Sequence, residues 1–181
     1  PLRREALDSL FRIYRTENDL PELLQVTKEL HDTSPHEPSL TANYARLALL
    51  LAPNTDEARR LAKEAFDAAP KDVSCALTYA FSLYSAGRTA EGLEVLQRLA
   101  PEEFEDPHNA VYAATLYVDQ NELELAKPHI AVAQKGPLFP EEKKLLDEAV
   151  AKAALAAPTS APQGTPPSPS PTPPEPEPAK P

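Results

Sequence analysis

A Tyr-Ala pair recurs three times along this chain at nearly constant spacing. The pairs begin at Tyr44, Tyr79 and Tyr112, so the tyrosines stand 35 and 33 residues apart. A period near 34 residues is typical of helical pairs that stack on one another, because one such pair cannot bury its apolar side alone. The spacing therefore predicts an all-α fold built by stacking.

Residues 72–101 contain one complete unit of this repeat. Apolar residues at intervals of three and four from Val73 to Tyr84 predict a first helix. Gly87 predicts its end, since a residue without Cβ adopts the left-handed conformation easily, and Thr89 is expected to cap a second helix. That helix carries three leucines and stops at a proline: Leu93, Leu96, Leu99 and Pro101. Two helices of about four turns joined by a short loop pack antiparallel.

The second helices of two other units carry mostly small residues at the same intervals, which allows close packing, and each is followed by a proline. These are Ala58, Ala62, Ala65 and Pro70 in one unit, and Ala126, Ile130, Ala133 and Pro137 in another. With the Tyr-Ala pairs, they give the chain a pattern that resembles the tetratricopeptide repeat family. The resemblance implies a right-handed α-solenoid of antiparallel helix pairs.

The repeats divide the chain into a helical domain, residues 1–157, and a tail. We expect helix pairs at about 3–35, 38–70, 72–101 and 106–137, and a capping helix at about 140–156. The capping helix is predicted to turn its charged residues toward water: Glu141, Glu142, Lys143, Lys144, Asp147 and Glu148. Because the chain begins at Pro1 and contains no methionine, we expect it to be part of a longer protein, with possible upstream repeats or domains.

The tail, residues 158–181, contains 11 of the 22 prolines and no aromatic or branched apolar side chain. Such a segment cannot bury enough surface to offset the entropy lost on ordering. It is predicted to be a disordered, proline-rich region with polyproline II character.

Composition excludes several classes of function. A formal charge of −10 disfavours nucleic acid and anionic membranes and favours basic partners weakly. The sequence contains no apolar run of about 18 residues, so we expect no direct membrane insertion. The lone Cys75 is predicted to be a buried, inert thiol, and the four histidines are scattered, with His108 expected at the surface near a helix end. We therefore predict no catalytic residues, no metal, no cofactor and no enzymatic activity.

The resemblance implies that the first helices of the pairs line a concave surface. Carried onto this sequence, that surface has one basic, one aliphatic and three aromatic candidates: Arg46, Leu49, Phe81, Tyr84 and Tyr117. Aromatic side chains on a preformed concave surface are frequent anchors for a peptide or helix. The leading hypothesis is a protein–protein interaction module that binds a peptide or helix of a partner there.

Three alternatives stay open. The aromatic rings could simply pack between neighbouring first helices. The repeats could form a structural or self-associating scaffold stacked on upstream repeats, or the regulatory repeat region of a larger enzyme. The sequence identifies neither the partner nor the compartment, with the cytoplasm slightly favoured over an exported setting.

Overall fold

A computed structural model describes residues 2–53 and 55–156, and all regular structure within them is helical, as predicted. The helices are α1 (Leu2–Glu17), α2 (Leu20–Thr33), α3 (Pro38–Leu51), α4 (Asp56–Ala68), α5 (Val73–Ser85), α6 (Thr89–Leu96), the 3-10 helix η1 (Pro101–Glu105), α7 (Pro107–Asp119), α8 (Leu123–Ala133) and α9 (Pro140–Ala156). The tail predicted to be disordered, residues 158–181, lies outside the described residues.

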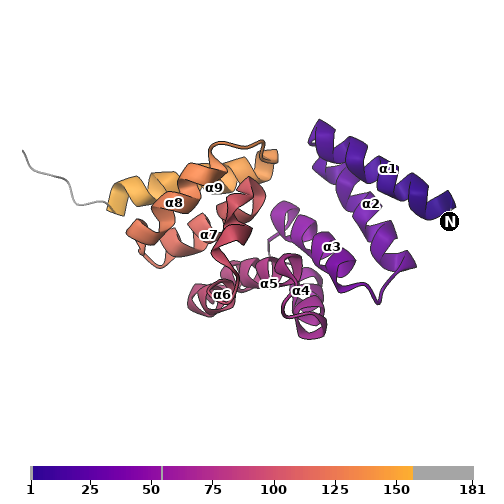
Figure 1. Ribbon diagram of the computed structural model, residues 1–181, viewed down its shortest axis with the longest axis horizontal. Helices are drawn as coiled ribbons and strands as arrows, with labels where there is room; N and C mark the ends of the chain where they lie inside the picture. Colours follow the sequence, from indigo (N-terminus) through magenta and orange to yellow (C-terminus); the bar gives the residue numbers. More distant parts are fainter. Residues whose placement is uncertain (1, 54, 157–181) are drawn as a thin grey trace, which may run out of the picture.

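The helices form an α-solenoid of stacked pairs bent into an arc. Helices α1 and α2, α3 and α4, α5 and α6, and α7 and α8 pack as hairpins, and α9 lies against α7 and α8. In Figure 1 the arc runs from α1 and α2, through α3 to α6, to α7, α8 and α9. The loop between α8 and α9 brings the start of α9 back toward the first pair.

Three of the first helices end in the same way. Asn18, Gly87 and Asn121 have positive φ angles of 56°, 75° and 61°. The amide of the next residue then bonds to a carbonyl in the last turn, as from Arg88 to Leu83 at 2.9 Å. This pattern satisfies carbonyls that the helix leaves unpaired. The predicted role of Gly87 is thus confirmed.

The cap predicted at Thr89 is wrong. Arg88 occupies the N-cap position of α6, and Thr89 is the first helical residue. The Thr89 hydroxyl instead donates a hydrogen bond of 2.6 Å to the Asp119 carboxylate at the end of α7. The side chain therefore links two helix pairs rather than capping its own helix.

Helix α6 is also shorter than the predicted four turns, since it ends at Leu96. The amides of Arg98 and Leu99 bond to carbonyls three residues earlier, which tightens the last turn. Pro101 disfavours helical geometry in the residue before it and prevents the helix from resuming there. Leu99 still packs against the main core from this turn.

Gly92 allows α6 to approach both α5 and α7. A Cβ atom at this position would lie 2.8 Å from the backbone oxygen of Ala80 and 2.9 Å from a methyl carbon of Leu116. Both distances are shorter than van der Waals contact, so a larger residue requires the helices to separate.

We expect Gly92→Ala to lower the free energy of unfolding by about 1–2 kcal/mol, measured by urea denaturation. Overpacking costs about 1–3 kcal/mol, and the higher helix propensity of alanine returns at most about 1 kcal/mol. Glu94→Ala on the exposed side of α6 is the control and should change stability by less than about 0.5 kcal/mol. A Gly92→Ala protein as stable as the parent would contradict the close approach.

The main hydrophobic core follows the inner helices. It passes from Leu49 of α3 through Leu77 and Phe81 of α5 to Tyr112 of α7, and reaches Leu146 of α9. The solenoid is therefore packed through its centre along α3, α5, α7 and α9.

Candidate functional site

A separate apolar cluster joins the two ends of the arc. Phe139, in the loop before α9, is 7% exposed and packs with Leu20 and Leu23 of α2 and Leu47 of α3. These residues are more than 90 positions away in the sequence. The chain thus fills part of its own concave side.

Glu142 fixes the start of α9 beside this cluster. The residue is 1% exposed, and its carboxylate lies 2.6 Å from Nδ1 of His108. It also accepts hydrogen bonds from the Tyr112 hydroxyl at 2.9 Å and the Phe139 amide at 3.2 Å. Burial and, secondarily, the Glu142 charge raise the pKa of Tyr112 well above its usual value.

The prediction that Glu142 faces water is therefore wrong, and so is the surface position expected for His108. The first residue of α9 is Pro140, so Glu142 is the third helical residue and reaches back to the amide of the residue before the helix. That geometry is half of a capping box. The sequence did contain a local signal for the bond to the Phe139 amide, namely a glutamate three positions after the helix boundary. The contacts of Glu142 with two residues of α7 depend on tertiary packing and had no such signal.

A small polar pocket of about 260 Å³ lies between the first pair, α3, α7 and the start of α9. Arg15, Arg46, His108 and Glu142 are among its lining residues. Arg46 donates a hydrogen bond of 3.2 Å to the Asn43 amide oxygen, and its guanidinium carbon lies 6.0 Å from the centre of the Tyr112 ring. The Arg46 guanidinium is therefore already engaged by side chains of α3 and α7.

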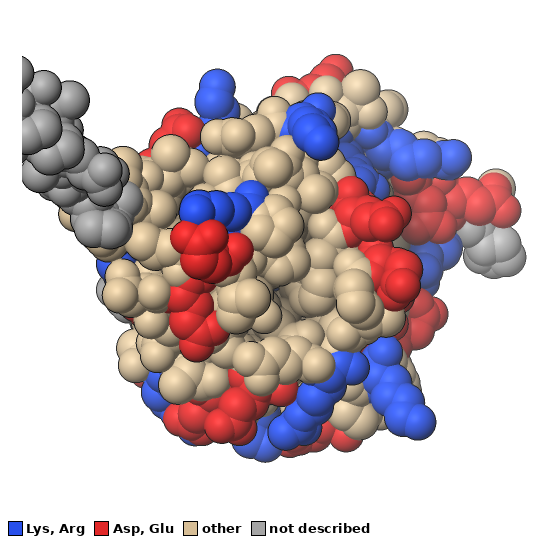
Figure 2. Space-filling model, turned by 60° about the vertical axis from the view of Figure 1, so that its left-hand side comes forward, with Lys and Arg blue, Asp and Glu red and all other residues tan. Residues whose placement is uncertain are grey.

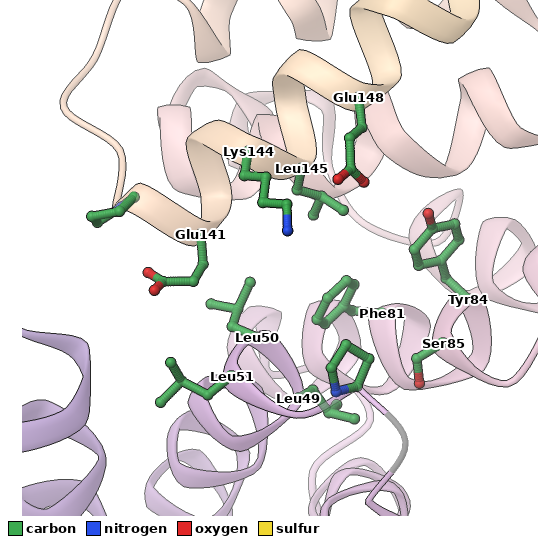
Figure 3. A pocket seen from close by; sticks show the side chains of 12 residues that line it. Leu49, Leu50, Leu51, Phe81, Tyr84, Ser85, Glu141, Lys144, Leu145 and Glu148 are labelled. Atoms are coloured by element: carbon green, nitrogen blue, oxygen red, sulfur yellow. The ribbon is translucent and has the colours of Figure 1, made fainter.

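A larger pocket, which we call the inner pocket, lies between α3 and α5 on one side and α9 on the other (Figure 3). Its volume is about 580 Å³, and its lining is Leu49, Leu50, Leu51, Pro53, Phe81, Tyr84, Ser85, Pro140, Glu141, Lys144, Leu145 and Glu148. The face in Figure 2 is hollowed near its centre, where uncharged side chains surround the hollow and charged ones lie farther out.

The walls of the inner pocket differ in character. Leucine and aromatic side chains of α3 and α5 form one wall, and Leu145 faces them from α9 (Figure 3). The α9 wall adds Glu141 at one end, Glu148 at the other above Tyr84, and Lys144 between them. Apolar walls with a few charged groups at the edge suit a partner with an apolar anchor and polar flanks.

Three of the five candidate residues line the inner pocket. Leu49 is 0% exposed and Phe81 is almost fully buried, so both also belong to the core, while Tyr84 is half-buried. Arg46 lies in the polar pocket instead. Tyr117 lines neither pocket and stacks on His129 of α8, with ring centres 5.5 Å apart.

Sequence reasoning missed the wall that α9 contributes and the outer residue Leu51. The position of Leu50 was visible in the repeat register, because the residue follows Leu49 on a helix apolar almost all round. The position of α9 across from α3 depends on the Phe139 cluster and had no local signal.

Other chemistry is sparse in the described part of the chain. Cys75 is buried, and burial with a nearby Asp72 raises its pKa to about 12, so the thiol is a poor nucleophile at neutral pH. Residues 2–53 and 55–156 contain no group of three or more His, Cys, Asp or Glu placed to hold a metal ion. Among the same residues, no helix has the length and apolarity needed to cross a membrane.

Comparison with known families agrees with this architecture. Residues 49–114 match the family model described as Tetratricopeptide repeat, which spans the end of α3 to the middle of α7. Over this segment the chain is similar to tetratricopeptide repeats, in agreement with the resemblance seen in the sequence. Such repeats generally mediate protein–protein interactions and are typically non-catalytic. No curated protein matches the chain.

Proposed function

We propose that this chain is a protein-interaction module that binds a segment of a partner protein in the inner pocket. The observation that carries the proposal is the pocket itself, about 580 Å³ with leucine and aromatic side chains on its α3 and α5 wall. It lies on the concave side of the repeats, where the resemblance placed the binding surface.

The rigidity of the walls favours binding. Leu49 and Phe81 belong to the main core, so the wall they form is present before any partner arrives. The start of α9 is held by the buried Glu142 contacts. A preformed site spares the binder the entropy of ordering its own side chains.

The half-exposed residues of the pocket supply the contact area. Leu51 is 37% exposed and Tyr84 is half-buried, so both have surface left to bury against a partner. An aromatic ring that is fixed at its base and open at one side is a frequent hot spot in protein interfaces.

The test is affinity capture from the source cells with the full 181-residue chain, compared with a Leu51→Gln/Tyr84→Ala variant. A partner bound in the inner pocket should be captured at least about tenfold less by the variant, since each truncated anchor costs about 1 kcal/mol or more. Leu125→Gln, at a leucine 52% exposed on α8 and outside the inner pocket, is the matched control.

Circular dichroism should show the same helix content in all three proteins. A partner captured equally by the parent and the double variant does not use the inner pocket. If every captured partner behaves in that way, the proposal is wrong.

A second candidate function, a scaffold stacked on further repeats or copies, rests on the free side of α1. Leu2 is 81% exposed and Ile13 49% exposed, and α1 packs chiefly against α2. Sedimentation of the free chain at several concentrations tests this candidate. Self-association that Ile13→Gln abolishes would support it, and a monomer at all concentrations would oppose self-association.

A further inference from the structure

We infer that the partner segment is a short helix with basic side chains on both sides of its apolar anchor, recognised by Glu141 and Glu148. The inference rests on the proposed function, because it names the chemistry of the occupant of the inner pocket. It comes from the charges and contacts of the α9 wall.

The two carboxylates stand at opposite ends of the pocket. Glu141 lies above Leu50 and Leu51 with its carboxylate turned toward the outer end of the pocket, away from Phe81, and Glu148 lies above Tyr84 (Figure 3). They are seven residues apart on one continuous helix, which is nearly two full turns and about 10.5 Å along the axis. A partner helix lying along α9 therefore meets one carboxylate at each end of the pocket.

Neither carboxylate is neutralised by the described part of the chain. No ion pair joins Glu141 or Glu148 to a described Lys, Arg or His side chain. One oxygen of Glu141, Oε2, is moreover buried without a hydrogen-bond partner among these residues.

Lys144 offsets only part of the negative charge of Glu141 and Glu148. Its ammonium lies between the two carboxylates and points toward the pocket (Figure 3). One lysine against two glutamates leaves the α9 wall with a net negative charge, in a chain whose formal charge is −10. Charge complementarity therefore selects a basic segment over an acidic one.

The shape of the pocket favours a helix as the form of this segment. The inner pocket is a trough with α3 and α5 on one side and α9 on the other, and most of the side chains that line it are apolar. A helix binds such a trough through residues at intervals of three, four and seven. Basic residues seven positions apart would flank apolar residues at the third and fourth positions between them, all on one face.

The experiment is selection of a phage-displayed library of helical peptides, randomised on one face, against the full 181-residue chain. We expect the enriched peptides to carry Lys or Arg at the seven-residue interval around apolar residues. The best peptide, made synthetically, should bind Glu141→Gln/Glu148→Gln about tenfold more weakly than the parent. Lys144→Gln should bind it about two- to fivefold more tightly.

Other results separate this inference from the proposed function. Peptides without basic residues that bind the parent and Glu141→Gln/Glu148→Gln equally, yet lose affinity for Leu51→Gln/Tyr84→Ala, would overturn the inference and leave the pocket as the binding site. Acidic peptides weakened by Lys144→Gln would do the same. If no selected peptide distinguishes the parent from Leu51→Gln/Tyr84→Ala, both proposals fail.

Discussion

Replacement of Glu142 with alanine is expected to lower the free energy of unfolding by about 3–5 kcal/mol. The Tyr112 hydroxyl, on a side chain 0% exposed, would lose its acceptor, and so would the Phe139 amide. Each buried donor left unpaired costs about 1–3 kcal/mol, and this substitution leaves two of them without their acceptor. Urea denaturation followed by circular dichroism measures the effect.

Two further variants identify the cause. Asp147→Ala, at an exposed carboxylate on the same helix, should change stability by less than about 0.5 kcal/mol. Tyr112→Phe, alone and combined with Glu142→Ala, forms a double-mutant cycle that isolates the 2.9 Å hydrogen bond. A cost below about 1 kcal/mol for Glu142→Ala, or no coupling in the cycle, would show that this network does not anchor α9.

The pairing of helices was predictable because its signals are local. Gly87 ends α5 through its own backbone conformation, with φ at 75°. Asp106 caps α7 by accepting a hydrogen bond of 2.8 Å from the His108 amide. The Tyr-Ala pairs repeat the buried side of each first helix, so their period indicated stacking before any tertiary contact was known.

The predictions that were wrong concern side chains whose partners are distant in the sequence. Glu142 follows the charged pattern of its helix, but α7 brings a tyrosine and a histidine to it. Thr89 could have capped α6, yet Asp119 at the end of another helix takes its hydroxyl. In both cases a polar side chain found a tertiary partner that no short sequence window contains.

The candidate site was predictable only where the repeat pattern determines it. Leu49, Phe81 and Tyr84 were found through the repeat register, which transfers between stacked pairs. Tyr117 occupies an equivalent register but stacks on His129, because the ring turns toward its own partner helix. The α9 wall could not be derived from the register, since it depends on closure of the arc.

The contacts that close the arc also position one wall of the inner pocket. The Phe139 cluster ties the start of α9 to α2 and α3, and the next residues, Pro140 and Glu141, already line the inner pocket. Leu50 belongs to the periphery of that cluster and also lines the pocket. A change that releases Phe139 should therefore alter both the stability of the arc and the width of the pocket.

We expect Phe139→Ala to lower the free energy of unfolding by about 3–5 kcal/mol. This is the usual cost of removing a buried phenylalanine ring. The loss should be localised as well as large, because Phe139 is the buried apolar residue that joins the last helix to Leu20 and Leu23 of the first pair. Hydrogen exchange followed by mass spectrometry should show faster exchange in α1, α2 and the start of α9 than in α5.

Phe104→Ala is the matched control, because Phe104 is a partly buried ring that contacts His129 and the main core within the last pairs. It should destabilise the chain without selectively accelerating exchange in α1 and α2. If Phe139→Ala raises exchange equally in all helices, the ends of the arc are not held by this cluster in particular. If the first pair loosens first, a single side chain maintains both the closed arc and the α9 wall of the inner pocket.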